Sequence, residues 1–263
     1  MDDYLRLMRL DRPVGTLLLL WPTLAALAMA ASGLPPLELI VIFTVGTFVM
    51  RSAGCVINDY ADRHVDGAVK RTKERPLVTG AINERQALQL FAALVLSAGV
   101  LILFLNTTTK LLAVGGLALA VTYPFMKRYT HLPQVVLGAA FSWGILMAWS
   151  AQDLGVPKEA LLLFIGSLFW IVAYDTQYAM VDRDDDLIVG IKSTAILFGE
   201  LDRFMIGVLQ TFALGTWFLL GVSLDYQHGF FIGLILITGL FAYQQTLTRD
   251  RSRDGCFAAF KNN

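Results

Sequence analysis

The sequence predicts an all-α protein whose helices cross a lipid bilayer, and three properties of the chain indicate this class. Hydrophobic residues make up 56% of the 263 residues, and charged residues make up only 16%, whereas a soluble domain carries about 25% charge. The mean hydropathy is +0.60. The apolar residues are also gathered into blocks, most of them close to the roughly 20 residues that a helix needs to cross the hydrocarbon core.

We predict that the chain forms one transmembrane domain over residues 1–263, a polytopic bundle with eight spans. The first apolar block is long and has no small-residue cleavage site, which argues against a cleaved signal peptide. The eight predicted spans are 14–33, 37–57, 88–105, 111–126, 133–150, 159–181, 204–224 and 229–247.

The distribution of positive charge predicts which helix ends face the cytoplasm, because Lys and Arg collect in cytoplasmic connections. Of the 21 Lys and Arg residues, only Lys110 and Lys158 fall in connections opposite the N-terminus, and only Arg51 lies inside an apolar block. All the others, including Arg12 ahead of the first block, fall on the side of the N-terminus. We therefore predict a cytoplasmic N-terminus and cytoplasmic charged connections.

Several classes of function are disfavoured by the composition. The formal net charge is zero, so there is no overall basic field to bind nucleic acid. The two cysteines, Cys55 and Cys256, are far apart in sequence and indicate neither a disulfide framework nor a metal site. The three histidines match no zinc-binding spacing.

A first acidic group, Asn58, Asp62 and Asp66, follows the second apolar block. These residues are four apart, so a helix that continued through them would place them within about 80° of one another. Carboxylates this close repel each other unless a cation lies between them. Oxygen donors without His or Cys favour a hard cation such as Mg²⁺. The alternative is a solvated helix end.

A second acidic group, Asp175, Asp182 and Asp186, begins near the end of the sixth block and continues beyond it, and this block runs toward the same side of the membrane. Spacings of seven and four residues place its members within roughly 40° on a helix. Asp175 follows an apolar run, where a carboxylate is costly and marks a candidate functional site. Asp184 and Asp185 are predicted to point elsewhere, into solvent.

Two groups of carboxylates around one cavity can hold two or more Mg²⁺ ions, which would neutralise a diphosphate and stabilise it as a leaving group. This is the chemical reason to expect two acidic groups instead of one. We therefore predict that Asp175 acts in catalysis together with a set of metal ligands. The predicted ligands are Asn58, Asp62, Asp66, Asp182 and Asp186.

Basic residues near the acidic groups are predicted to bind substrate. Arg71 and Arg75 are the preferred partners of a diphosphate, since a guanidinium group binds such oxygens in a bidentate manner. The alternative for each is that it only follows the positive-inside rule. Arg128, at another cytoplasmic end, is a further candidate for contact with the substrate, and Lys192, just after the second acidic group, is a weaker candidate of the same kind.

Three residues within apolar surroundings each allow two interpretations. Arg51 lies two helical turns before Asn58 on the same face, and it either binds the carboxylate of an acidic acceptor or pairs with an aspartate. Tyr174 or Tyr178 either stabilises a substrate cation through its ring face or anchors the helix at the membrane interface. We include Arg51 and Tyr178 among the predicted substrate-binding residues.

The sequence resembles the UbiA family of intramembrane prenyltransferases over almost its whole length. The family pattern NxxxDxxxD matches Asn58, Asp62 and Asp66, and the second family motif matches Asp182 and Asp186. The combination is specific, whereas DxxxD alone is not. Four strings carry the resemblance: NDYADRHVDG, KRTKERPL, YPFMKRYTHLPQVVLG and YDTQYAMVDRDDD.

The resemblance implies a helical bundle in the bacterial inner membrane, with a central cavity that opens sideways to lipid. It also implies a Mg²⁺-dependent transfer of a polyprenyl group from polyprenyl diphosphate to 4-hydroxybenzoate. The new bond forms ortho to the phenol hydroxyl, which is the ring-prenylating step of ubiquinone synthesis. Members of the family usually have nine spans, so we expect the ninth to be absent from this sequence.

Two alternatives remain open from the sequence. Within the same enzyme class, the acceptor could be another molecule, such as homogentisate, dihydroxynaphthoate or haem. In a different class, acidic gates could belong to an ion or organic-anion transporter.

Overall fold

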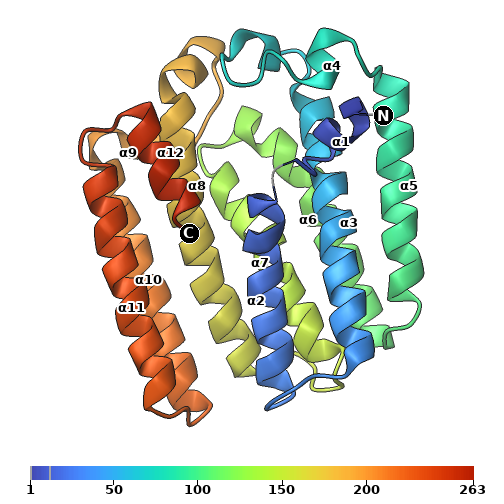
Figure 1. Ribbon diagram of the computed structural model, residues 1–263, viewed down its shortest axis with the longest axis vertical. Helices are drawn as coiled ribbons and strands as arrows, with labels where there is room; N and C mark the ends of the chain where they lie inside the picture. The colour runs from blue at the N-terminus through green and yellow to red at the C-terminus, as the bar shows by residue number, and fades with distance from the viewer. Residues whose placement is uncertain (1, 12) are drawn as a thin grey trace. The chain divides into compact units, whose positions relative to one another are not determined.

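In the computed structural model, which describes residues 2–11 and 13–263, that part of the chain is helical and contains no strand (Figure 1). Arg12, used above in the charge distribution, lies outside the described residues. The chain divides into two units, which we describe separately. Unit 1 comprises Met1–Phe125 and Trp143–Gly155, and unit 2 comprises Met126–Ser142 and Val156–Asn263.

Unit 1 is built around α3, which packs against α2 and α5. A capping box starts α5: Asn83 accepts a hydrogen bond from the Gln86 backbone, and the Gln86 side chain accepts one from the Asn83 backbone. The helices of this unit are α1 (Asp2–Leu7), α2 (Val14–Ala30), α3 (Leu37–Asp62), the 3-10 helix η1 (Asp66–Ala68), α4 (Pro76–Thr79), α5 (Glu84–Ile102), most of α6 (Thr107–Tyr129) and the second half of α7 (Pro133–Ser150).

Unit 2 is built around the long helix α8, which packs against α9, α10 and α12. Gly166 allows close packing here, because a Cβ atom at this position would lie 2.5 Å from Thr216 Oγ1 and 2.6 Å from Trp217 Nε1. The further helices of the unit are α8 (Lys158–Val189), α9 (Thr194–Phe198), the 3-10 helix η2 (Gly199–Leu201), α10 (Asp202–Ser223), α11 (His228–Leu247) and α12 (Arg253–Lys261).

All eight predicted spans are helical, and six segments are long and apolar enough to cross a membrane. These are α3, α5, α6, α8, the stretch Thr194–Ser223 that contains α9 and α10, and α11. The apolar helix α2 is shorter, with 17 residues, and α7 is not among the six. The crossing of the membrane by all eight therefore stays a prediction.

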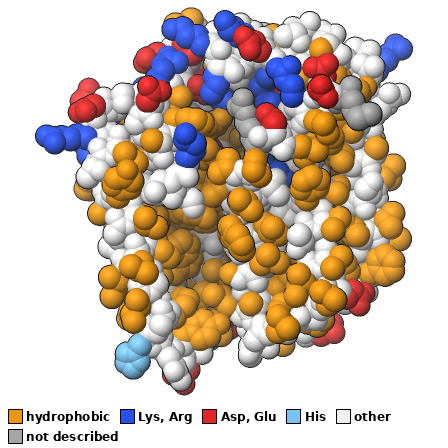
Figure 2. All heavy atoms as spheres, in the orientation of Figure 1, with side chains coloured by type: hydrophobic (Ala, Val, Ile, Leu, Met, Phe, Trp, Pro, Cys, Tyr) orange, Lys and Arg blue, Asp and Glu red, His pale blue; other side chains and the backbone are white. Residues whose placement is uncertain are grey.

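The surfaces of these helices support a membrane location. Large hydrophobic side chains such as Leu96 (72% exposed), Leu111 and Ile235 point away from the protein, and a soluble protein rarely exposes apolar surface on this scale. Figure 2 shows hydrophobic side chains over much of the surface that faces the viewer. The chain is an integral membrane protein.

Buried amides link the membrane helices of unit 2. Gln244 Oε1 in α11 accepts hydrogen bonds from Gln177 Nε2 in α8 at 3.2 Å and from Gln210 Nε2 in α10 at 2.9 Å. Gln244 Nε2 donates to Asn262 Oδ1 at 3.2 Å. In an apolar environment such interhelical bonds stabilise the association of helices.

We predict that Gln244→Leu destabilises the protein by about 1–2 kcal/mol, because two buried amide donors lose their acceptor. The measurement is the unfolding midpoint in detergent. Thr238→Val, a polar-to-apolar change on the exposed face of α11, is the matched control and should change stability by less than about 0.5 kcal/mol. Equal midpoints for the two variants would contradict the prediction.

Candidate active site

The first acidic group lies at the end of α3. This helix ends before Asp66, so it is too short to carry all three residues of the group on one face. Asn58 and Asp62 are on α3, which ends at Asp62. The Val65 N–H then donates to the Asp62 carbonyl at 2.8 Å, a bond of the i to i−3 type. Asp66 follows in η1. The helix therefore does not continue through all three residues, and the expected single stripe is wrong for Asp66.

The oxygens of this group suit a hard cation. The Asp62 and Asp66 side chains are buried. Asn58 Oδ1 is also buried, and no hydrogen-bond donor among the residues that the structure describes reaches it. An amide oxygen in this state is costly unless it binds something else. Amide and carboxylate oxygens are ligands that Mg²⁺ accepts, so the donor set fits this metal.

Acidic side chains alone do not assemble a complete metal site. Within residues 2–11 and 13–263, no group of three or more His, Cys, Asp or Glu side chains is arranged to hold a metal ion. The argument for Mg²⁺ therefore rests on the buried oxygen atoms of Asn58 and Asp62 and not on a preformed cluster of carboxylates.

Asp59, which was not predicted as a site residue, lies at the centre of a buried chain of ion pairs. Arg9 Nη2 donates to both of its carboxylate oxygens at 3.0 Å. Arg75 Nη1 lies 2.9 Å from Asp59 Oδ1 and 2.5 Å from Asp66 Oδ2. The only signal for Asp59 in the sequence is its place beside Asn58, about 100° from Asn58 and about 60° from Asp62 around the helix.

The predicted diphosphate partner Arg75 binds the protein's own carboxylates in this structure. Burial alone would lower the pKa of Arg75, but the Asp59 and Asp66 carboxylates outweigh burial and raise the pKa above its usual value. Arg75 is therefore a permanent cation beside the first acidic group. Arg71 is exposed in the turn between η1 and α4. Binding of a diphosphate by either residue stays a prediction.

Arg51 is held inside α3 by a contact that was not expected. Its Nη1 donates a hydrogen bond to Cys55 Sγ, one turn further along the helix. Its guanidinium also lies against Gly15 of α2. The structure thus gives Arg51 a defined place within unit 1 on the helix that carries Asn58.

The second acidic group is carried by one uninterrupted helix. Because α8 extends to Val189, Asp175, Asp182 and Asp186 share one helical stripe, and the predicted arrangement is confirmed. Asp182 and Asp186 are buried, and Asp175 is half-buried.

The prediction that Asp185 points into solvent is wrong. Its side chain is bound by Arg253 of α12, whose Nη1 and Nη2 donate to it at 2.9 and 3.2 Å, and only 7% of the residue is exposed. The hydrogen bond to Asp185 raises the pKa of Arg253. The neighbouring Asp184 is exposed, as predicted, with 80% of its side chain accessible.

Aromatic residues of α8 and α12 pack beside the second acidic group. The ring of Tyr178 lies 4.6 Å from that of Phe260, centroid to centroid. Tyr174 contacts Trp170 and Phe260 at 5.2 and 5.8 Å and is only 2% exposed. Burial excludes Tyr174 as an interfacial anchor. Tyr178 is half-buried, and both interpretations remain for it.

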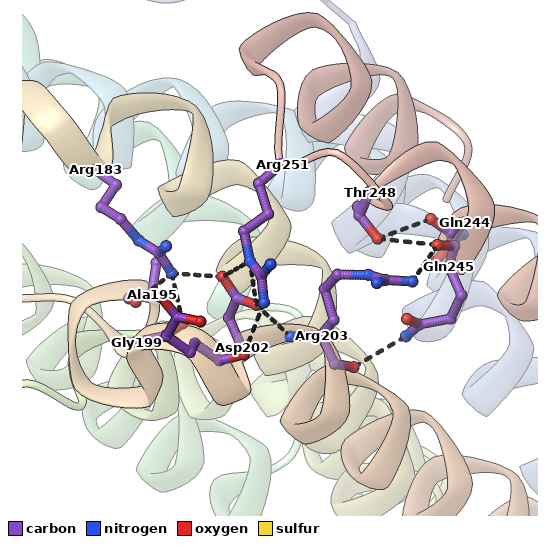
Figure 3. Close-up of polar contacts among 10 residues, drawn as sticks. Arg183, Ala195, Gly199, Asp202, Arg203, Gln244, Gln245, Thr248 and Arg251 are labelled. Atoms are coloured by element: carbon purple, nitrogen blue, oxygen red, sulfur yellow. Dashed lines mark hydrogen bonds and ion pairs between the residues drawn. The ribbon is translucent and has the colours of Figure 1, made fainter.

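Buried Asp202 at the start of α10 holds the end of α8 (Figure 3). It accepts hydrogen bonds from Arg183 Nη2 at 2.5 Å and from Arg251 Nε at 3.0 and 3.1 Å. Arg183 lies between Asp182 and Asp186 on α8. Its contact with Asp202 therefore fixes the turn of helix that carries these two carboxylates.

Two further predicted basic residues come together within unit 2. The Lys192 N–H donates to the Lys127 carbonyl at 2.9 Å, and Lys192 Nζ donates to the Tyr129 carbonyl at 3.3 Å. These carbonyls flank Arg128, whose side chain is exposed at the end of α6. Lys192 and Arg128 are thus neighbours, although 64 positions separate them in the sequence.

Apolar helices combined with one acidic group at the end of α3 and another on α8 are the features expected of an intramembrane enzyme. Residues 19–263 match the UbiA prenyltransferase family. The chain belongs to this family.

Individual relatives are named for one reaction. Proteins called 4-hydroxybenzoate octaprenyltransferase from Chromohalobacter salexigens, Photobacterium profundum and Vibrio cholerae are 59%, 58% and 57% identical to this chain. Each match covers 99% of this chain, and it covers 88%, 91% and 92% of the respective relative.

Solved structures share the fold at lower identity. A UbiA homologue from Aeropyrum pernix K1 superposes with a TM-score of 0.83 at 24% identity, over 93% of this chain and 92% of that chain. A UbiA homologue from Archaeoglobus fulgidus, solved with GPP and Mg²⁺, gives a TM-score of 0.72 at 19% identity, over 94% of this chain and 87% of that chain.

We predict that Asp185→Asn loosens α12 from α8, because the amide cannot replace the ion pair with Arg253. Cys256 of α12 reports this change: it is fully buried, and burial raises the pKa of its thiol to about 11, so at pH 8 it is protonated and unreactive. Asp185→Asn should increase the alkylation rate of Cys256 several-fold, with the labelled cysteine identified by mass spectrometry.

Asp184→Asn is the control for this labelling experiment, since Asp184 is exposed and lies 3.6 Å from Arg253. Its labelling rate should match that of the unaltered protein. Equal rates for both variants would show that Asp185 does not hold α12.

Proposed function

We propose that this chain transfers a polyprenyl group from polyprenyl diphosphate to 4-hydroxybenzoate, forming a carbon–carbon bond ortho to the phenol hydroxyl in ubiquinone synthesis. The observation that carries this proposal is the 57–59% identity, over 99% of the chain, to relatives named 4-hydroxybenzoate octaprenyltransferase. The two acidic groups supply the chemistry that such a reaction needs.

Mg²⁺ is the metal that the oxygen donors favour. We propose that Asn58 and Asp62 of unit 1 would hold Mg²⁺, and that Asp182 and Asp186 of unit 2 would also hold Mg²⁺. Asp66, whose Oδ2 is bound by Arg75, would be a further ligand in unit 1. When bound, the metal neutralises the diphosphate and stabilises it as a leaving group. The presence of Mg²⁺ with GPP in the Archaeoglobus fulgidus homologue supports the choice of metal.

The chain's own cations are proposed to hold the two substrates. Arg71 and Arg75 bind the diphosphate, and Arg128 and Lys192 add positive charge for the same group. Arg51 binds the carboxylate of 4-hydroxybenzoate, the only charged group of that acceptor at neutral pH.

The carbon that loses the diphosphate is an allylic cation, and the phenol ring attacks it through the carbon ortho to the hydroxyl. The ring carbon that has formed the new bond then gives its proton to an unidentified base, and the ring regains its aromaticity. Tyr178 is proposed to stabilise the cation through its ring face. Asp175, half-buried on the same stripe as Asp182, is proposed to act in catalysis with the metal ligands.

We further propose that one domain of eight spans lies in the bacterial inner membrane, with the N-terminus and the active site facing the cytoplasm. The bias of Lys and Arg supports this orientation. Each CH₂ of a prenyl chain gains about 0.8 kcal/mol from apolar surroundings. An enzyme that keeps the tail in lipid and the diphosphate near water therefore suits such a donor.

The test of this function is the conversion of polyprenyl diphosphate and 4-hydroxybenzoate by the purified protein in detergent with Mg²⁺. Asp62→Ala and Asp182→Ala should each lower kcat by roughly 100-fold or more, since even the outer-shell partners of a bound metal typically cost 10–100-fold. Asp184→Ala, on the exposed side of α8, is the control and should keep near-normal activity.

Full activity in Asp62→Ala or Asp182→Ala would overturn the metal assignment. Product from homogentisate or dihydroxynaphthoate, but none from 4-hydroxybenzoate, would replace the acceptor. Solute flux in liposomes without any prenylated product would favour a transporter.

A further inference from the structure

Gly15 in α2 makes room for the guanidinium group of Arg51 in α3. A Cβ atom built on Gly15 would lie 2.8 Å from Arg51 Nε and 3.0 Å from Cζ, and it would come closer still to Nη2. Ordinary contact begins near 3.4 Å. Any larger residue at this position would therefore displace the guanidinium.

The backbone conformation does not explain the glycine. Gly15 lies in the first turns of α2 and is not among the described glycines with a positive φ, so an L-residue could adopt its backbone angles. The residue is buried, and the three atoms nearest to a Cβ built on it all belong to Arg51. Room for that guanidinium is thus the property that glycine supplies here.

A second contact fixes the same group from its own helix. Arg51 Nη1 donates to Cys55 Sγ, and Cys55 is buried. The guanidinium is planar, so a contact with the α2 backbone on one side and a hydrogen bond at one edge restrict both its position and its orientation. A fixed guanidinium is suited to bidentate binding of a carboxylate.

Placing an arginine inside an apolar helix is costly. Arginines inside a membrane span are rare, and they generally serve a function. The close approach of α2 and the hydrogen bond to Cys55 restrain the arginine instead of leaving it to extend toward the nearest water.

We infer that Gly15 is a positioning residue for Arg51 and, through it, a determinant of specificity for acceptors that carry a carboxylate. This inference rests on the proposed function, in which Arg51 binds the carboxylate of 4-hydroxybenzoate. The size of residue 15 then sets where that carboxylate is bound. Residue 15 has no role toward the diphosphate of the donor.

The first test compares Gly15→Ala with the unaltered protein in detergent. The Kd of 4-hydroxybenzoate, measured by calorimetry, and its KM should rise about 10- to 100-fold, as expected for a binding group displaced by up to about an ångström. The KM of the polyprenyl diphosphate should change less than twofold. Gly54→Ala on α3, where a Cβ atom meets nothing within 4 Å, is the control and should leave all these values unchanged.

The second test separates positioning from a general structural effect. For 4-hydroxybenzamide, which lacks the negative charge, Gly15→Ala should change the KM less than twofold. In an Arg51→Lys background the guanidinium is gone, so adding Gly15→Ala should change the Kd of 4-hydroxybenzoate less than twofold. Should Gly15→Ala alone fail to fold, recovery of folding in the double variant supports the inference, and failure of both overturns it.

Other outcomes distinguish failure of the inference about Gly15 from failure of the proposed function. Equal losses for 4-hydroxybenzoate and 4-hydroxybenzamide, or full additivity with Arg51→Lys, would overturn the positioning role. If the unaltered protein bound 4-hydroxybenzoate and Gly15→Ala weakened that binding, but no prenylated product formed, the inference would stand and the proposed function would fail. Absence of any binding by the unaltered protein would overturn both.

Discussion

The pairing of buried carboxylates with arginines is the constraint on which the acidic helix ends depend. A carboxylate removed from water strongly disfavours its charged form unless a cation lies beside it. Asp59 meets Arg9 and Arg75, and Asp202 meets Arg183 and Arg251. Neither of these aspartates belongs to the predicted metal ligands. Asp59 and Asp202 instead hold the arginines and the backbone around the predicted ligands. Each acidic group is therefore supported by a neighbouring ion-pair network.

The two acidic groups differ in how the backbone presents them. On α8 the helix continues past Asp186, and the spacing of its carboxylates translates directly into one stripe. On α3 the helix ends at Asp62, and Asp66 is placed by a turn in which its carbonyl accepts a hydrogen bond from Thr72 Oγ1 at 2.7 Å. The first group therefore depends on the loop after α3, whereas the second group needs no loop. A change in that loop affects the position of Asp66 more directly than the position of Asp62.

Local periodicity predicted the helical class, the eight apolar segments and the stripe on α8, because each depends on residues a few positions apart. It could not predict the partners of Asp59 and Asp185. Arg9 lies 50 positions from Asp59, and Arg253 lies 68 positions from Asp185. Such pairs form only when segments that are distant in sequence pack together, so local residue spacing does not predict them. The end of α3 escaped prediction for a related reason: Arg63 to Asp66 contain no proline or glycine that would mark the break.

The bond between Arg253 and Asp185 also bears on how the protein is made. Ribosomes add roughly 5–20 residues per second, and 68 positions separate the two residues. Arg253 is therefore synthesised roughly 3–14 s after Asp185. During that interval α10 and α11 are still being made, and the acidic end of α8 has no α12 to pack against. Maturation of the second acidic group therefore waits until α12 has been made.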